Sequence, residues 1–125
     1  MSANPVLKLR STMPGVPDVD HPRPERLVRG NPRRETWNVL DAPLAQGSRL
    51  YTGVWRCEPG QWRIEFGPHE HELFTVLQGR CRVHAEGGGF EEAGPGEALA
   101  IGPGFRGSFE VLETLTKTYA IVDGA

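Results

Sequence analysis

The residues with the clearest capacity for chemistry are four consecutive polar side chains, from His69 to Glu72, which read HEHE. Two imidazoles beside a carboxylate are a typical first sign of a transition-metal site. Neighbouring side chains of a strand point to opposite faces, so His71 points outward if Glu72 points inward. His69 follows a Gly-Pro pair, which is a turn signal. The sequence therefore favours an exposed turn over a metal site. If a metal is present, its expected ligands are Glu72, His69 and His71.

Glu72 is the member of this group best suited to a buried role, because it shares strand parity with the apolar Phe74. A carboxylate inside a protein is costly unless a metal, a cation or hydrogen bonds accompany it. Lys117 is a candidate partner, since it shares strand parity with Tyr119 and Ile121. The alternative, a surface lysine with its ammonium in water, stays open at this point.

Aromatic side chains are spread over most of the expected strands, and some of them must line the interior of the fold. Most of them are expected to be plain core. With an acid and a lysine among them, we expect a pocket for a small organic molecule. The residues expected to line this pocket are Glu72, Lys117, Phe66, Trp55, Tyr51, Phe74, Phe109 and Tyr119.

Strands must position these side chains. The chain has 125 residues, which is the length of one domain, and its 16 glycines and 11 prolines are too many for a helical bundle. Trp62, Ile64 and Phe66 alternate with polar residues at period two, which is typical of a half-buried strand. Gly and Pro clusters separate such stretches as turns. The predicted strands span residues 34–40, 49–58, 61–67, 71–78, 80–85, 97–102, 107–113 and 115–122.

The helical pattern is missing from the sequence. No stretch has ten or more residues of helical periodicity between caps. We therefore predict an all-β, single-domain fold of antiparallel strands, a compact barrel or jelly roll with little helix.

Residues 1–29 differ from the remainder, because they are rich in proline and arginine and poor in large apolar side chains. We expect an N-terminal arm over residues 1–29 and one domain over residues 30–125. Val6, Leu7 and Leu9 are expected to pair with a sheet edge. The arginines at 23, 26, 29, 33 and 34 lack interleaved aromatics, and the net charge is −2. A solvated surface is therefore favoured over a nucleic-acid site.

The chain also lacks the long apolar runs of a signal peptide or a membrane span. Its two cysteines, Cys57 and Cys81, fall in separate expected strands without metal-type spacing. Free thiols fit a reducing compartment. A cytoplasmic protein that binds neither membrane nor nucleic acid is therefore expected.

Several glycines and one acid of the chain also fit two longer sequence motifs. Gly60, Glu72 and Gly79 occupy the glycine and acid positions of G-x5-H-x-H-x3-E-x6-G, while Phe66 and Pro68 stand at its two histidine positions. This pattern is the first of the two sequence motifs of the cupin superfamily. The chain resembles that superfamily in its scaffold. The resemblance implies an RmlC-like cupin barrel, also called a double-stranded β-helix or jelly roll.

The second cupin motif, G-x5-P-x-G-x2-H-x3-N, is matched at Gly96 and Gly104. Gly102 replaces its proline, Gly107 its histidine and Val111 its asparagine. One ligand position of four, the acid of the first motif, is therefore kept. The scaffold resemblance alone does not give the function.

The stretch from Gly30 to Val122, about three-quarters of the chain, resembles the short cupins grouped with ureidoglycine aminohydrolase. The resemblance is carried by ELFTVLQG, GPGFRGSFE and KTYAIV, which occur in that order. It implies an alternative function, a metal-dependent hydrolase or lyase acting on a small nitrogenous or carboxylated substrate, with Mn, Fe, Ni or Zn as the divalent cofactor.

Because three ligand residues are absent, the sequence favours a different function over the metal-dependent enzyme. The favoured function is that of a small cupin that binds an organic metabolite without a metal cofactor, as an accessory or weakly catalytic protein. Sheet edges left open by a barrel, and an arm able to pair with a neighbour, predict a homodimer.

Overall fold

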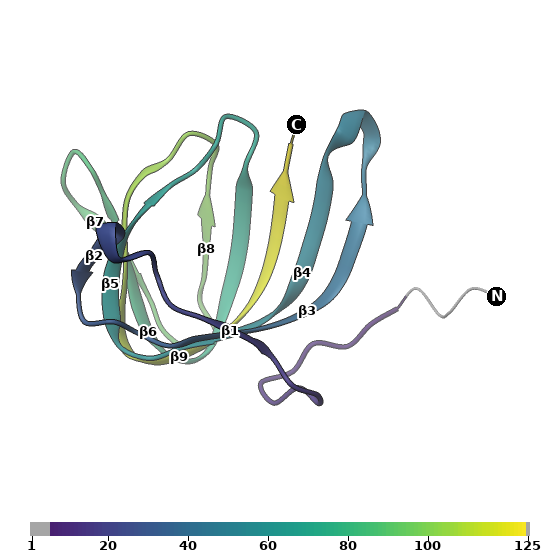
Figure 1. The fold of residues 1–125 in the computed structure, drawn as a ribbon, viewed down its shortest axis with the longest axis horizontal. Helices are drawn as coiled ribbons and strands as arrows, with labels where there is room; N and C mark the ends of the chain where they lie inside the picture. The colour runs from purple at the N-terminus through teal and green to yellow at the C-terminus, as the bar shows by residue number, and fades with distance from the viewer. Residues whose placement is uncertain (1–5, 125) are drawn as a thin grey trace.

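The protein, described over residues 6–124 by a computed structural model, forms one strongly curled sheet of nine antiparallel strands (Figure 1). The strands are β1 (Asp18–Asp20), β2 (Leu27–Arg29), β3 (Arg34–Pro43), β4 (Arg49–Cys57), β5 (Gly60–Glu65), β6 (His71–Ala85), β7 (Phe90–Ala93), β8 (Ala98–Ile101) and β9 (Arg106–Asp123). Within the described residues the only helical segments are two three-residue 3-10 turns, Pro24–Arg26 and Ala45–Gly47. The prediction of an all-β antiparallel barrel with little helix is confirmed.

Two long strands, β6 and β9, pair along their whole length and form the spine of the sheet. The first half of β9 also pairs with β5, and its second half also pairs with β4. Along the main path the strand order is β1-β3-β4-β9-β5-β2, while β7 and β8 both pair with β6. The curl therefore brings side chains from β3, β4, β5, β6 and β9 around one interior.

The sequence predicts one strand on each side of Gly79, whereas the structure has the single bent strand β6 across it. The register with β9 shifts on both sides of Gly79, which has a φ of 86°. A Cβ built on Gly79 would lie 2.1 Å from the carbonyl oxygen of Thr114. This glycine therefore permits a bulge that bends the strand without ending it. The two strands predicted over 107–113 and 115–122 are likewise one strand, β9.

The arm contributes strands, but different residues from those predicted. β1 pairs with β3, and β2 pairs with β5, so the arm runs along the curled sheet (Figure 1). Residues 6–10 form no strand, so the expected strand pairing of Leu7 and Leu9 with a sheet edge is wrong. Leu7 and Leu9 instead line a hollow with Leu40 and Leu73. Apolar side chains this close to the chain end are held by packing, which needs no ladder hydrogen bonds. The boundary at residue 30 stays a prediction.

The core lies inside the curl, where inward positions of neighbouring strands meet. Phe74, Val76, Val111 and Leu115 are almost fully buried. They come from β6 and β9, and within each strand they lie on the same face. Strand β7 was not predicted, because its four residues include two glutamates and lie between glycine-rich turns.

Candidate functional site

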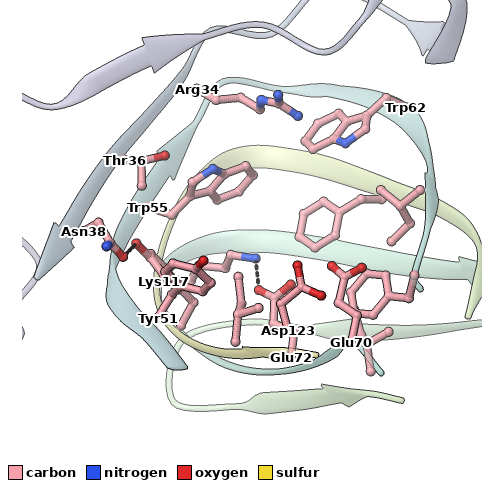
Figure 2. Close-up of a pocket in the computed structure, with 16 residues that line it drawn as sticks. Arg34, Thr36, Asn38, Tyr51, Trp55, Trp62, Glu70, Glu72, Lys117 and Asp123 are labelled. Atoms are coloured by element: carbon pink, nitrogen blue, oxygen red, sulfur yellow. Dashed lines mark hydrogen bonds and ion pairs between the residues drawn. The ribbon is translucent and has the colours of Figure 1, made fainter. Parts of the chain in front are cut away.

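A pocket of about 520 Å³ lies inside the curled sheet, beside the core (Figure 2). Side chains from six strands, most of them polar or aromatic, and from the turn before β6 line it. The lining residues are Arg34, Thr36, Asn38, Tyr51, Trp55, Trp62, Ile64, Phe66, Glu70, Glu72, Ile101, Phe109, Lys117, Tyr119, Ile121 and Asp123. Of the eight residues predicted to line a pocket, seven lie in this set. Phe74 does not, because it is 1% exposed and belongs to the core behind the pocket wall.

The centre of the pocket holds an ion pair between β6 and β9. Lys117 Nζ donates to Glu72 Oε2 at 2.8 Å, and the two side chains are only 7% and 12% exposed. The lysine is therefore no surface lysine with its ammonium in bulk water. Strand parity and the cost of a buried carboxylate together predicted this pairing.

Aromatic rings surround the same ammonium group. Lys117 Nζ lies 4.2 Å from the ring centroid of Phe74, 4.5 Å from that of Trp55 and 4.8 Å from that of Phe109. The negative face of each ring attracts a cation at this range. One carboxylate and three rings thus compensate the lysine charge inside the protein.

Stacked aromatic rings form one wall of the pocket. Trp62 stacks on Phe109 with centroids 5.5 Å apart, and Trp55 packs edge-on against Phe109 at 5.8 Å. Phe66 contacts Phe105 in a T-shaped arrangement at 6.3 Å. These pairs hold flat apolar surfaces toward the pocket, and such surfaces suit the carbon skeleton of an organic ligand.

Tyr119 supplies a hydroxyl that is held in place. Its Oη donates to Asn38 Oδ1 at 2.7 Å. Burial, with a further contribution from the Glu72 charge, raises the pKa of Tyr119 to about 12, so the phenol stays protonated and keeps this bond. Gly53 leaves room for it, since a Cβ there would lie 2.6 Å from the hydroxyl and 2.1 Å from the carbonyl oxygen of Trp37.

Arg34 lies on the opposite side of the pocket from the carboxylates, next to Trp62 (Figure 2). Two of its nitrogens donate to the Asp20 carboxylate, at 2.9 Å and 2.8 Å, in the fork geometry that guanidinium favours. Its guanidinium carbon lies 5.3 Å from the Trp62 ring centroid. The arm is thereby tied to the pocket through its strand β1.

Two acids of the pocket were not predicted from the sequence. Glu70, Glu72 and Asp123 direct their carboxylates into the same part of the pocket (Figure 2). Glu70 Oε1 accepts a hydrogen bond from the Gly67 amide at 3.0 Å. Asp123 has the parity of Lys117, so one more step along β9 would have identified it. Glu70 lies in a turn, where strand parity gives no direction.

The histidines next to Glu72 do not join it. His71 is exposed and its neighbour Glu72 faces inward, as alternation predicts. His69 is exposed, and its carbonyl accepts from the Gly124 amide at 3.2 Å. No three His, Cys, Asp or Glu side chains in residues 6–124 are grouped closely enough to hold a metal ion.

The cupin histidine positions differ in shape as well as in residue type. Phe66 presents a ring to the pocket, and Pro68 is exposed in the turn. A Cβ on Gly107 would lie 1.9 Å from the carbonyl oxygen of His84, so this position has no room for an imidazole. The donor set therefore does not fit a transition metal of the cupin type.

The two cysteines are buried and free. Burial raises the pKa of Cys57 to about 12 and that of Cys81 to about 11. Both are therefore thiols rather than thiolates at neutral pH, which suits core packing and not nucleophilic chemistry.

The EutQ-like cupin domain family matches residues 44–119, which is more than half of the chain and includes most of the pocket. The chain belongs to this family. The sequence-based placement in the cupin superfamily is confirmed at this level. No protein with a curated description matches the chain.

Solved structures similar to this EutQ-like cupin support the fold. A DUF861 family protein of unknown function from Pseudomonas syringae pv. tomato has a TM-score of 0.74 and 22% identity. The match covers 90% of this chain and 46% of the Pseudomonas syringae chain. The EutQ protein of Clostridium difficile has a TM-score of 0.60 and 15% identity, covering 74% and 64%. The putative ethanolamine utilization protein Q of Salmonella typhimurium has a TM-score of 0.58 and 18% identity, covering 70% and 68%.

This cupin thus spans less than half the length of the Pseudomonas syringae protein. At such identities the likeness concerns the fold alone. In the part of the chain that the structure describes, no helix has the length and apolar character needed to cross a membrane.

Proposed function

We propose that this EutQ-like cupin binds a small organic molecule in the pocket between β4, β5, β6 and β9, without a transition-metal cofactor. The observation that carries the proposal is the contact of 2.8 Å between Lys117 Nζ and Glu72 Oε2. Glu72 stands where cupin metal sites keep their acid, and here a cation of the chain itself neutralises it. Glu72 then serves to hold Lys117 in a fixed place in the pocket wall.

The remaining charges indicate which molecule the pocket favours. Three carboxylates, Glu70, Glu72 and Asp123, share one part of the pocket, and Lys117 compensates only one of them. An excess of negative charge beside aromatic faces favours a ligand with an ammonium group. These carboxylates are not grouped as a metal site would require, so a larger organic cation fits their spacing better than a bare metal ion.

A metal-dependent hydrolase or lyase, similar to ureidoglycine aminohydrolase, is the alternative. Its metal would have to displace Lys117 from Glu72 and recruit ligands other than Phe66 and Gly107. No contact within the described residues favours that rearrangement. The alternative therefore ranks second and is included in the test below.

The expected homodimer and cytoplasmic location stay predictions. The arm pairs with the β3 and β5 edges of its own sheet, which removes two edges that a partner would otherwise cover. Buried free thiols at Cys57 and Cys81 agree with a reducing compartment.

The test uses protein purified without an affinity tag, analysed for metals and then titrated calorimetrically with benzylamine and with benzyl alcohol. We expect benzylamine to bind, benzyl alcohol to bind at least about tenfold more weakly, and a chelator to change neither result. Glu70→Gln and Asp123→Asn should each weaken benzylamine binding, whereas Glu86→Gln, in an exposed turn, is the matched control. One stoichiometric Mn, Fe, Ni or Zn, with binding lost on chelation, would favour the hydrolase alternative instead.

A further inference from the structure

A second hollow of about 320 Å³ adjoins the pocket at the side where Arg34 lies. It is lined by residues from the arm, β3, β5 and the turn before β6. They are Pro22, Arg23, Arg26, Arg34, Trp62, Arg63, Ile64, Glu65, Phe66 and Glu70. Arg34, Trp62, Ile64, Phe66 and Glu70 line both spaces, so the hollow and the pocket adjoin each other along these side chains. A molecule that reaches past these side chains contacts both spaces.

The hollow has a net positive charge, opposite to that of the pocket. Four arginines line it against two glutamates. Glu65 is shared between Arg106 at 3.0 Å and Arg26 at 4.0 Å. Glu70 accepts from the Gly67 amide and belongs equally to the pocket. The two carboxylates thus leave a surplus of guanidinium groups around the hollow.

Two of these arginines have no carboxylate partner. Arg23 and Arg63 form no ion pair with any residue in the range 6–124, although Arg63 donates to the carbonyl of Glu25. That hydrogen bond ties β5 to the 3-10 turn Pro24–Arg26 and holds the arm over the hollow. Of the five arginines that the sequence assigns to a solvated surface, Arg23, Arg26 and Arg34 line this hollow, together with Arg63.

We propose that this hollow binds the anionic end, a phosphate or carboxylate group, of the molecule whose ammonium end lies in the pocket. The guanidinium fork matches both oxyanions, and the surplus arginines offer it without first breaking an ion pair. The ligand class is then a small molecule with an ammonium at one end and an oxyanion at the other. This inference rests on the proposed function, since it assigns the second end of the same ligand.

The test compares four probes in calorimetric titrations: n-butylamine, 4-aminobutyrate, 3-aminopropylphosphonate and inorganic phosphate. We expect 3-aminopropylphosphonate or 4-aminobutyrate to bind at least about tenfold more tightly than n-butylamine, as one charge-assisted hydrogen-bond pair would give. The tighter of the two identifies the oxyanion. Inorganic phosphate alone should bind more weakly than the bifunctional probe.

The double variant Arg23→Gln/Arg63→Gln should remove the tenfold advantage of the anionic probes. Arg10→Gln, an exposed arm residue outside the hollow, is the matched control and should keep it. Retained n-butylamine binding in the double variant would report that the fold is intact. If n-butylamine binds and the anionic probes bind no better, this inference is wrong while the proposed function stands. Phosphate binding that depends on both arginines, without n-butylamine binding, would support the hollow and contradict the ammonium site. Binding of none of the four probes would overturn both.

Discussion

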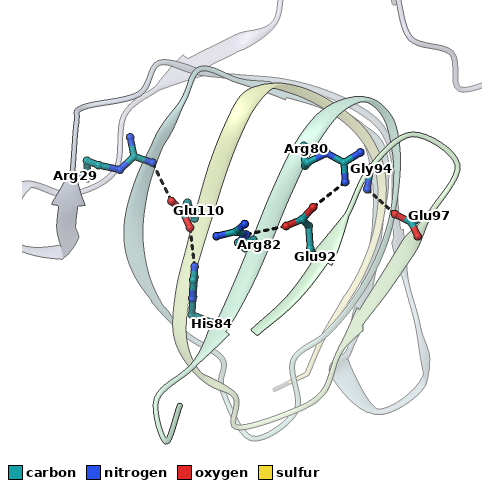
Figure 3. Close-up of polar contacts among 8 residues, drawn as sticks. All are labelled: Arg29, Arg80, Arg82, His84, Glu92, Gly94, Glu97 and Glu110. Carbon is teal, nitrogen blue, oxygen red and sulfur yellow. Dashed lines mark hydrogen bonds and ion pairs between the residues drawn. The ribbon is translucent and has the colours of Figure 1, made fainter. Parts of the chain in front are cut away.

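The inner and outer faces of β6 and β9 both hold ion pairs, and their surroundings differ sharply. Inside, Glu72 and Lys117 are about nine-tenths buried and pair with each other, and aromatic rings surround the lysine ammonium. On the outer face, Glu110 lies between His84 at 2.7 Å and Arg29 at 3.2 Å, with 15% of its side chain exposed (Figure 3). The same kind of pairing therefore occurs at two levels of access to water.

A more exposed example lies between β6 and β7. Glu92 accepts from Arg80 at 2.9 Å and from Arg82 at 2.8 Å, and all three side chains are about one-third exposed (Figure 3). Water can replace either arginine there, so the pairing contributes little to stability. Glu72 and Lys117 are only 12% and 7% exposed, so loss of one partner leaves a buried charge without compensation. Burial, and not the distance between the charges, decides how much each pair matters.

The largest effect is expected at the buried pair. Glu72→Gln alone or Lys117→Met alone should lower the free energy of unfolding by roughly 3 to 5 kcal/mol, because each leaves an uncompensated buried charge. The double variant should cost much less than the sum of the two, since it leaves no charge behind. Urea unfolding of the four proteins gives the coupling energy.

The matched control is the exposed pair of Asp41 and Arg49, whose closest atoms are 2.7 Å apart, against 2.8 Å for the inner pair. Its double-mutant cycle should be additive, although the distance is as short. Additivity within about 0.5 kcal/mol at Glu72 and Lys117 would show that burial does not strengthen the inner pair.

The sequence predicted the inner pair because two simple rules meet there. Strand alternation gave the direction of Glu72 and Lys117, and the cost of a buried carboxylate required a partner. The same alternation along β3 would have added Arg34, Thr36 and Asn38, which occupy every second position and all line the pocket.

Other parts of the site depend on contacts that alternation cannot give. Glu70 lies in a turn, and its direction is fixed by the hydrogen bond from Gly67. The arginine hollow forms because the arm folds back onto β3 and onto β5, which lies more than 30 residues away along the chain. The bend of β6 at Gly79 depends on its close approach to Thr114. Strand pairings between distant segments are not encoded in any local pattern.

The second prediction compares how well the pocket wall and the exposed loop between β6 and β7 tolerate an added methyl group. Gly53→Ala should destabilise the protein by about 1 to 3 kcal/mol, because the new methyl group would collide with the Trp37 carbonyl and the Tyr119 hydroxyl. Gly87→Ala, in the loop between β6 and β7 with open space around it, is the control and should be close to neutral. Thermal unfolding of both variants measures the difference. Equal effects would mean that the pocket wall adapts as freely as the loop.

A smaller, pH-dependent effect is expected at Glu110. Burial raises the pKa of this carboxyl, but the hydrogen bond from His84 and the charge of Arg29 outweigh it, so the pKa lies below the ordinary value of 4.5. A lowered folded-state pKa stabilises the fold above the unfolded-state value, and the contribution is lost as the pH falls through the folded-state pKa. Glu110→Gln should therefore cost on the order of 1 kcal/mol near neutral pH, and this difference should shrink below about pH 4.5.

Urea unfolding of the native protein and the Glu110→Gln variant over a series of pH values measures that trend. The expected curves converge toward acid. A difference that stays constant or grows as the pH falls would contradict the assignment of the stabilisation to the charged form of Glu110.

The smallest effect is expected at Glu92, the exposed end of the comparison. Arg82 and Arg80 hold the pKa of this carboxyl below its usual value through their hydrogen bonds, yet the site is open to solvent. Salt screens such charges over about 8 Å at physiological ionic strength, and side-chain entropy opposes the pairing. Glu92→Gln should therefore leave the urea midpoint almost unchanged, and any difference seen at low salt should vanish when salt is added. Glu72→Gln, measured in the same buffers, should keep its effect at high salt, because salt screens a buried pair much less than an exposed one. If Glu92→Gln instead caused a loss of stability that persisted at high salt, the exposed pairs of Glu92 would behave like the buried pair of Glu72 and Lys117. Solvent exposure would then no longer explain the difference between the outer and inner faces.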